Sequence, residues 1–350
     1  MNLIAETAGR LLDDHQPFVL ATIVNREGSA PRTAGTRMIV AAGGRAVGTI
    51  GGGLLEARAI AAAAEVLAAR RPLLIPFDMT QSELAAMDMI CGGRLEVLLE
   101  FVDSHGPAAG VLKGWRDAQR NPDLCFFLTV LRFTDGKVTA VDHCLLKDDT
   151  VVYGDLPLGA ATLAMLVSQN PGATRLRTVS LGESLVLVDP VLPPDTVFLF
   201  GAGHVAQPTA RLAAIAGFRV RVVDDRADFA NAERFPEAEE VRVVTDFDSA
   251  SNGLAIDRGA FVVIVTRGHL HDKTVLMQAL RTEAAYIGMI GSRRKRDHIF
   301  NALLKQGFTQ ADLERVHSPI GIDIGAETPE EIALSIVAEL VHVRARRRRS

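Results

Sequence analysis

The chain has few of the residues that mark several protein classes. Three of its 350 residues are cysteine, and aromatic side chains make up 5%. Cys91, Cys125 and Cys144 are odd in number and widely spaced, which fits neither a disulfide framework nor a C-x-x-C metal knuckle. No run approaches about eighteen apolar residues, so we expect no membrane span. The N-terminal stretch is typical of an amphipathic helix rather than a signal peptide, and we expect a protein of the reducing cytoplasm.

An excess of charge of one sign is also lacking. The net charge of −4 argues against a nucleic-acid-binding protein. A short basic run closes the sequence after the last expected helix, and we interpret it as a solvated end rather than an anion-docking site: Arg344, Arg346, Arg347, Arg348 and Arg349. Hydrophobic residues make up 48%, which is ample for packed cores, and the length suits two domains.

What the chain does contain is a βαβ pattern between Val197 and Asp225. An apolar strand leads into a G-x-G-x-x-A turn with Gly201 and Gly203, then a helix, then a second strand that ends in Asp224. Such glycines let the backbone approach a pyrophosphate, and the helix N-terminus supplies amides for it. An acid at the position of Asp224 usually accepts a hydrogen bond from a ribose hydroxyl. The pattern predicts a dinucleotide-binding unit.

Two domains are expected, with a boundary near residue 192. Strands alternate with helices beyond Asp225, which predicts a Rossmann-like, doubly wound parallel sheet for residues 193–350. A capping box at Thr328 and Glu331 predicts the start of its last helix. Residues 1–192 are typical of an α/β (α+β) domain with hairpins at Gly43-Gly44 and Asp135-Gly136. A proline-rich linker is expected at the boundary, with Pro190, Pro193 and Pro194.

The strand ends of the second domain carry unusual residues, which we expect to converge on one cleft. His204 lies inside the glycine turn, as a ligand contact or a surface histidine. His269, His271 and Asp272 could share a metal ion, but we favour Asp272 as the cap of a helix beginning at Lys273. Ser292 and Arg293 open a further helix and are candidates for touching phosphate. Asp224, Asp225 and Arg226 follow the second strand.

The first domain holds a second group of candidates. Arg32 and Gly35 lie in a glycine-punctuated loop, and Gly51, Gly52 and Gly53 precede a helix that carries Glu56. A triple glycine can cradle an oxyanion or form a tight turn. Cys91, followed by Gly92-Gly93, suits an accessible thiolate that binds a soft metal, although an inert buried cysteine is equally allowed. Cys125 and Cys144 lie in apolar strands and are expected in the core.

Together these segments resemble the XdhC/CoxI family of accessory proteins, which mature molybdenum hydroxylases such as xanthine dehydrogenase. The resemblance rests on GSAPRTAGTRMIV, TIGGGLLEA, CGGRLEV, FLFGAGHVAQP, VVDDRADFANAERFP, TRGHLHD, YIGMIGSRRKR and HSPIGIDIGAETPEEIALSIVAEL, in that order. It covers nearly the whole chain, except about residues 103–190. It marks these motif positions without assigning them roles: Arg32, Gly35, Gly52, Glu56, Cys91, Gly201, Gly203, His204, Asp224, Arg226, His269, Asp272, Ser292, Arg293 and Pro319.

The resemblance implies a cytoplasmic chaperone that binds molybdenum cofactor. Such a chaperone holds the cofactor while a cysteine desulfurase replaces a molybdenum oxygen with sulfur, and then inserts it into the apo-hydroxylase. We expect the glycine turn and arginines to suit the cofactor's phosphate, and Cys91 to contact molybdenum. Both halves would then share one ligand, within one chain or across a homodimer. The Rossmann-like half would suit a dinucleotide form of the cofactor, a nicotinamide nucleotide or no nucleotide.

Two other functions stay open. An NAD(P)-dependent oxidoreductase would use the glycine fingerprint, with His204 or His269 as acid–base group. Neither Tyr153 nor Tyr286 is followed by lysine at the spacing of a Tyr-x-x-x-Lys pair, which weighs against it. A nucleotide-sensing regulatory protein without chemistry is the third function. We expect a non-enzymatic maturation chaperone.

Overall fold

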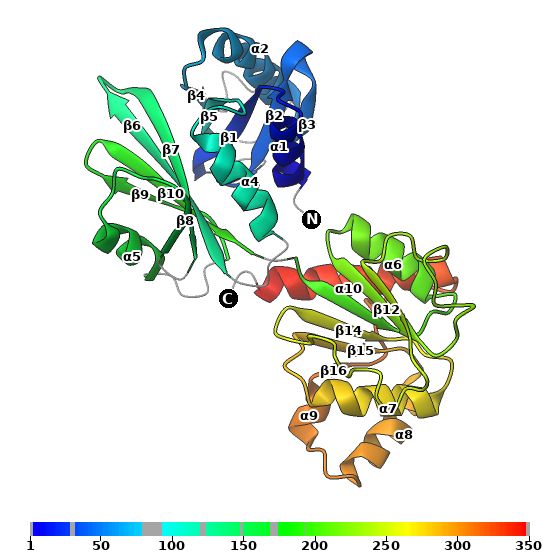
Figure 1. Cartoon of the computed structure of the whole chain (residues 1–350). Coiled ribbons are helices and arrows are strands. Elements are labelled where there is room, and N and C mark those ends of the chain that lie inside the picture. Colours follow the sequence, from blue (N-terminus) through cyan, green and yellow to red (C-terminus); the bar gives the residue numbers. More distant parts are fainter. Residues whose placement is uncertain are drawn as a thin grey trace. The chain divides into compact units, whose positions relative to one another are not determined.

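The structure is a computed structural model that describes residues 3–28, 32–78, 93–119, 124–147, 150–168, 174–192 and 194–347. The chain divides into two compact units, Asn2–Pro193 and Pro194–Ser350 (Figure 1). The boundary expected from the sequence, residue 192, lies next to this division. No helix in the described ranges is both long and apolar enough to cross a bilayer.

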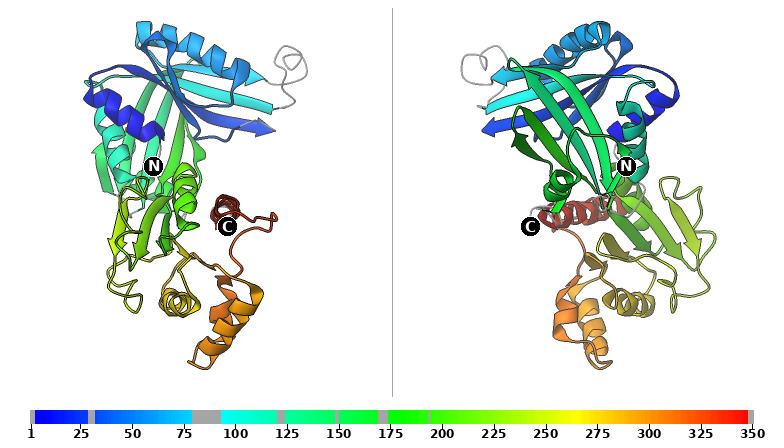
Figure 2. Two further views of the ribbon diagram at one scale, coloured as in Figure 1. Left: turned by 90° about the vertical axis from the view of Figure 1, so that its right-hand side faces the viewer. Right: turned by 60° about the vertical axis from the view of Figure 1, so that its left-hand side comes forward.

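The first unit contains an antiparallel sheet, sheet A, with the order β3-β2-β1-β5-β4. Helix α2 (Gly53–Ala69) lies across one face, and its Leu55, Ala59 and Ala63 join the core beneath it (Figure 2). The predicted hairpin at Gly43-Gly44 joins β2 to β3, with a short 3-10 turn, η1 (Ala42–Gly44), between them. The strands are β1 (Phe18–Gly28), β2 (Arg37–Ala41), β3 (Ala46–Gly48), β4 (Leu73–Asp78) and β5 (Gly93–Val102).

A second antiparallel sheet, sheet B, has the order β8-β7-β6-β10-β9. The predicted turn at Asp135-Gly136 joins β6 to β7, and both of its residues have positive φ. The sequence analysis missed β8, α5 and β9, which bear short or weakly patterned apolar runs. The elements are β6 (Cys125–Thr134), β7 (Lys137–Lys147), β8 (Thr150–Gly154), α5 (Ala160–Ser168), β9 (Arg177–Leu181) and β10 (Ser184–Val191).

The two sheets pack face to face around a shared core. Leu98 of sheet A meets Leu131 and Leu187 of sheet B. Helices α1 (Leu3–Asp13) and α4 (Ala108–Ala118) close one side of this core. Cys125 and Cys144 are buried, as predicted, and burial raises the pKa of the Cys144 thiol to about 12. A thiol with so high a pKa is protonated at neutral pH and inert.

The linker prediction was wrong for Pro190. This residue belongs to β10, where it pairs with Phe126 of β6. On the other side of β10, strand β9 pairs only as far as Val188 of β10, so Pro190 has a neighbouring strand on one side alone. A proline lacks the N–H that would donate to a neighbouring strand. It is tolerated at Pro190 because no strand lies on the open side to accept such a hydrogen bond.

The second unit is a six-stranded parallel sheet with the order β13-β12-β11-β14-β15-β16. This is the strand order 3-2-1-4-5-6 of dinucleotide-binding folds, so the predicted Rossmann-like sheet is confirmed. Helices α6 and α10 cover one face, and α7 and α8 the other. The strands are β11 (Thr196–Phe200), β12 (Arg219–Asp224), β13 (Glu240–Val243), β14 (Ala260–Ile264), β15 (Tyr286–Met289) and β16 (Val316–His317); the helices are α6 (Ala206–Ile215), α7 (His269–Leu280), α8 (Arg293–Leu304), α9 (Gln310–Glu314) and α10 (Pro329–Arg347).

The capping box of α10 is confirmed: Glu331 Oε2 accepts from the Thr328 amide at 3.1 Å, and Thr328 Oγ1 from the Glu331 amide at 3.3 Å. The prediction of a solvated basic tail was wrong in part, because α10 extends to Arg347. Arg344 donates to the Ala216 carbonyl at 2.9 Å, and Arg347 pairs with Asp195 at 3.2 Å. Arg348 and Arg349 lie outside the described residues.

Candidate functional site

The glycine turn after β11 is fixed by close backbone packing. Gly201 has φ +112°, and a Cβ there would lie 2.4 Å from the Val265 carbonyl oxygen. Gly203 differs, because a Cβ built on it meets nothing within 4 Å. Within residues 194–347, the backbone N–H groups of Gly203 and His204 have no hydrogen-bond partner. The turn therefore presents free amides beside open space, at the start of α6, where a helix favours anions.

Asp224 holds this turn from the neighbouring strand. Its Oδ2 accepts from the Ala202 amide at 2.7 Å, and its Oδ1 accepts from Arg226 Nε at 2.9 Å. The residue is buried, which raises the pKa of the carboxyl, but the hydrogen bonds from Arg226 and Ala202 outweigh burial and hold the pKa below its ordinary value. The predicted ribose contact stays a prediction. In the structure both oxygens of Asp224 already accept internal hydrogen bonds.

Contacts connect the glycine turn to the ends of the other strands. Gly201 lies against the backbone of Val265, just beyond the end of β14, at a distance that leaves no room for a Cβ. Arg267, two residues further, donates to Asp225 Oδ2 at 2.6 Å, next to Asp224 at the end of β12. Three strand ends that are distant in sequence thus lie together at the carboxyl edge of the sheet.

The prediction that Asp272 caps a helix was wrong. Helix α7 begins at His269 with Gly268 as its N-cap, so Asp272 lies inside the first turn. Its side chain is fully buried, accepts from Thr266 Oγ1 at 2.6 Å and forms an ion pair with Lys295 of α8. Burial outweighs these partners and raises the pKa of the Asp272 carboxyl. The pair ties the end of β14 to the end of β15.

Sequence reasoning missed Lys295. It belongs to the run of four basic residues from Arg293 to Arg296, of which only Arg293 was a candidate. Its ammonium group donates to the Ile290 carbonyl at 3.2 Å in addition to the Asp272 pair. Its position three residues after Ser292 was the available signal, because such a residue lies in the first turn of the expected helix.

The histidines do not gather around Asp272. The His271 ring packs on Phe247, with centroids 5.0 Å apart, and the His269 ring lies edge-on to His298 at 6.4 Å. His204 is exposed in the turn. Among the residues the structure describes, no three His, Cys, Asp or Glu side chains are placed to hold a metal ion. The metal interpretation of this segment therefore gains no support.

Ser292 and Arg293 start α8. Ser292 is the N-cap, and its hydroxyl accepts from the Lys295 amide at 3.3 Å. Arg293 is exposed beside it. The predicted roles of these two residues in binding phosphate stay predictions. The motif position Pro319 follows β16, where Glu339 of α10 anchors the chain by accepting from His317 Nδ1 and the Gly321 amide, each at 2.8 Å.

In the first unit, the glycine-rich turn cradles a carboxylate of the protein itself. Glu56 Oε1 accepts from the amides of Ile50, Gly51 and Gly52, at 3.1, 3.3 and 2.8 Å. The Thr49 hydroxyl donates to the same oxygen. Burial raises the pKa of Glu56, but these hydrogen bonds outweigh it and lower the pKa below its ordinary value. The oxyanion in this cradle is therefore Glu56, and Gly53 begins the helix that carries it.

Replacing Glu56 by glutamine tests this arrangement through its pH dependence. A carboxyl whose pKa is lowered by folding stabilises the fold above its ordinary pKa, about 4.3, and loses that effect as the pH falls through the lowered value. We expect the wild type to have a higher melting temperature than Glu56→Gln at pH 7. The difference in melting temperature should shrink toward pH 3. Trp115 fluorescence reports the melting. Glu65→Gln, on the exposed face of α2, should show no such trend; a gap independent of pH would contradict the assignment.

The structure describes two of the three remaining candidates of the first unit, Arg32 and Gly35. Arg32 is exposed, and Gly35 donates its amide to the Ile23 carbonyl at 2.8 Å. Cys91 lies outside the described residues, so its predicted contact with molybdenum stays a prediction. Arg37, two residues from Gly35, is the first residue of β2; it is buried and pairs with Asp189 of β10 at 2.6 Å.

Comparison with known proteins matches two parts of the chain to models of one protein family. Residues 197–340 match the model of the XdhC Rossmann domain, and residues 11–78 match that of the XdhC and CoxI family. A crystal structure of a xanthine dehydrogenase from Bacillus halodurans is 28% identical, with a TM-score of 0.80 over 98% of this chain and 96% of that one.

Three curated relatives align along most of the chain. The uncharacterized protein YqeB of Escherichia coli is 27% identical over 98% of this chain, which spans 46% of that relative's length. A probable xanthine dehydrogenase subunit of Bacillus subtilis is 29% identical over 96% of each chain. The molybdenum cofactor insertion chaperone PaoD of Escherichia coli is 25% identical, over 93% of this chain and 83% of its own length. With both family models matched in order along the chain, this protein belongs to the XdhC and CoxI family.

Proposed function

We propose that this protein binds molybdenum cofactor, holds it for sulfuration and delivers it to an apo molybdenum hydroxylase such as xanthine dehydrogenase. Membership of the XdhC and CoxI family supports the proposal, as does the relative that is named a molybdenum cofactor insertion chaperone. The relative named for xanthine dehydrogenase supports the hydroxylase as partner. A cysteine desulfurase would supply the sulfur.

The observation that carries the proposal is the glycine turn of the second unit. Molybdenum cofactor is a pterin dithiolene that ends in a phosphate, so its carrier needs a site for an anion. Free amides at Gly203 and His204, next to a helix N-terminus, fit a phosphate. Asp224 already holds the turn in shape, so little conformational entropy is lost when an anion binds.

Neither cysteine in the described part of the chain is available as a soft ligand for the metal end of the cofactor. Cys125 and Cys144 are buried, which leaves Cys91 as the proposed thiolate toward molybdenum. Thiolates are preferred ligands of soft metal centres. Full loading of Cys91→Ser with molybdenum and pterin would contradict this part of the proposal.

Gly203→Asp should abolish cofactor loading without harming the fold. A side chain at Gly203 enters open space, so the carboxylate would lie where the phosphate binds and repel it. The test purifies the protein from cells that co-express its hydroxylase and measures bound molybdenum and pterin. We expect at least a tenfold loss for Gly203→Asp. Gly159→Asp, which adds the same charge at an open, exposed glycine of the other unit, is the control. Equal loading of both variants would contradict the proposal.

A nicotinamide nucleotide is the second candidate ligand, favoured by the strand order 3-2-1-4-5-6 and the glycine turn. Asp224 weighs against it, because the acid expected to clamp a ribose is bonded to Ala202 and Arg226. Equilibrium dialysis against NADH and NADPH separates the two. Tight binding of either, with turnover of added carbonyl compounds, would favour an oxidoreductase; binding without turnover and without pterin would favour a regulatory protein.

A further inference from the structure

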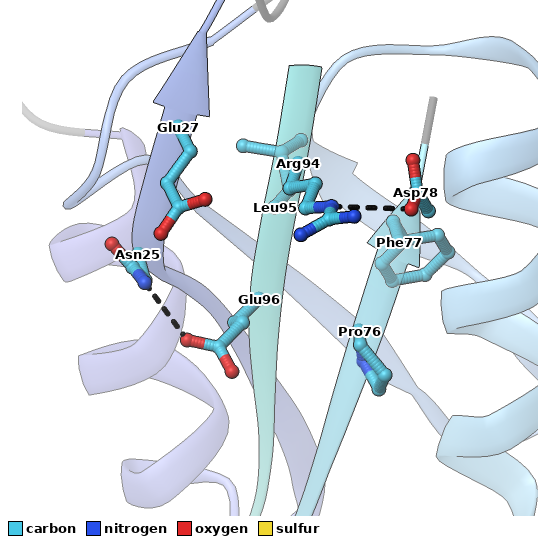
Figure 3. A pocket seen from close by; sticks show the side chains of 8 residues that line it. All are labelled: Asn25, Glu27, Pro76, Phe77, Asp78, Arg94, Leu95 and Glu96. Atoms are coloured by element: carbon cyan, nitrogen blue, oxygen red, sulfur yellow. Dashed lines mark hydrogen bonds and ion pairs between the residues drawn. The ribbon is translucent and has the colours of Figure 1, made fainter. Parts of the chain in front are cut away.

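A pocket lies on sheet A where β1, β5 and β4 run side by side (Figure 3). Its volume of about 390 Å³ is in the range of small-molecule sites. Paired positions of the three strands build it, with Glu96 of β5 between Asn25 of β1 and Pro76 of β4. The lining is completed by Glu27, Phe77, Asp78, Arg94 and Leu95.

Glu96 is held in one orientation with acceptor capacity left over. Asn25 Nδ2 donates to Glu96 Oε2 at 3.1 Å, and Figure 3 shows this bond spanning the gap between β1 and β5. Glu96 is half-buried, and its Oε1 has no partner among the residues that the structure describes. A carboxylate has about four lone-pair sites, so Glu96 can accept two further hydrogen bonds.

The one cation of the described lining is already engaged. Arg94 Nε donates to Asp78 Oδ2 at 3.1 Å, on the β4 side of the pocket. Glu27, on the β1 side, has no ion pair within the described ranges. With carboxylates at Glu27, Asp78 and Glu96 against one guanidinium, the pocket repels anions. A phosphate or a dithiolene therefore has no place in it.

A neutral ligand with two adjacent N–H donors fits this chemistry. The 2-amino-4-oxopyrimidine ring of a pterin presents an N–H and an NH2 side by side, matched to the two oxygens of a carboxylate. Guanine presents the same edge, and protein carboxylates accept such hydrogen bonds from base amino groups. Pro76 supplies an exposed apolar wall for a flat ring.

We propose that this pocket recognises a 2-amino-4-oxopyrimidine edge, with Glu96 as the acceptor. The inference rests on the proposed function in naming a pterin as the natural source; a guanine nucleotide is the other source of the same edge. The pterin edge lies at the end of molybdenum cofactor remote from its phosphate, which agrees with a pocket that repels anions.

The experiment measures binding of free pterin to the full chain by fluorescence and equilibrium dialysis. Its 2-oxo analogue lumazine lacks the amino group, and guanosine carries the same edge on another ring. We expect pterin to bind at least tenfold more tightly than lumazine, and Glu96→Gln to weaken pterin by roughly tenfold to a hundredfold. Glutamine keeps the bond to Asn25 but turns an amide donor toward the ligand's donors. Glu65→Gln removes one carboxylate from the exposed face of α2 and should leave binding unchanged.

Each outcome decides the proposal. Selective binding of pterin that Glu96→Gln removes supports it with a pterin source, and the same result with guanosine alone supports it with a guanine source. Equal binding of pterin and lumazine, equal binding by wild type and Glu96→Gln, or displacement of pterin by equimolar arginine would overturn it. The last result would assign the pocket to a basic side chain of a partner protein. Cofactor loading in the Gly203→Asp experiment is read separately, so either proposal can fail without the other.

Discussion

Gly201→Ala is expected to destabilise the second unit by roughly 2–5 kcal/mol. The backbone at Gly201 has φ +112°, which L side chains rarely adopt, and the added methyl would lie 2.4 Å from the Val265 carbonyl oxygen. Neither backbone segment can move away from the other without breaking hydrogen bonds, because the Gly201 amide donates to the Val223 carbonyl and the Val265 amide to the Phe200 carbonyl. Urea unfolding followed by far-UV circular dichroism measures the loss.

Gly203→Ala is the matched control for this substitution. A methyl at Gly203 meets nothing within 4 Å, so its stability should stay within about 0.5 kcal/mol of wild type. The single tryptophan, Trp115, lies in the first unit, and its fluorescence should report an unchanged transition in both variants. Equal stability of the two glycine variants would contradict the packing described for the turn.

Asp189→Ala is expected to destabilise the first unit by about 3–5 kcal/mol, since it leaves a buried charge without its partner. Arg37 pairs with Asp189 at 2.6 Å, and its side chain is 7% exposed. Its Nε and Nη2 have no hydrogen bond among the described residues, so the carboxylate is the main compensation for the guanidinium. The guanidinium carbon lies 5.1 Å from the Trp115 ring centroid, which makes Trp115 fluorescence a local probe of unfolding.

An exposed ion pair of the same unit gives the control. Asp142 pairs with Arg132 at 3.0 Å, with side chains 27% and 48% exposed. Removing one partner of such a pair costs about 0–1 kcal/mol, so Asp142→Ala should change little. If Asp189→Ala cost no more than Asp142→Ala, the Arg37 pair would not be the buried interaction described. Asp189→Asn, which keeps an acceptor for Arg37, should fall between the two.

The local patterns of the sequence predicted much of the fold. The G-x-G-x-x-A turn with its flanking strands, the capping box of α10 and the Asp135-Gly136 hairpin each depend on residues close in sequence. Their backbone requirements are therefore written within a few positions. Gly201 differs in part, because its glycine is required both by the positive φ of its own residue and by the carbonyl of Val265, a residue distant in sequence.

The candidate site was predicted only in part, because the partner of a polar side chain depends on which strands become neighbours. Asp272 looked like a cap, yet the sheet places Thr266 and Lys295 around it. The triple glycine looked ready for an outside anion, yet one turn of α2 brings Glu56 into it. No local pattern signalled that Glu100 and His143, 43 residues apart, would meet at 2.8 Å between the two sheets.

The sequence by itself determined most of the elements of sheet A, the parallel βαβ architecture of the second unit and the family, because these depend on short-range backbone preference and motif order. Only the tertiary structure decided which charges are compensated inside the protein and which remain for a ligand. Arg37 and Asp189 are 152 residues apart and become partners when sheet A packs on sheet B. The free amides at Gly203 and the free oxygen of Glu96 are what that internal pairing leaves over, and on them the proposed binding depends.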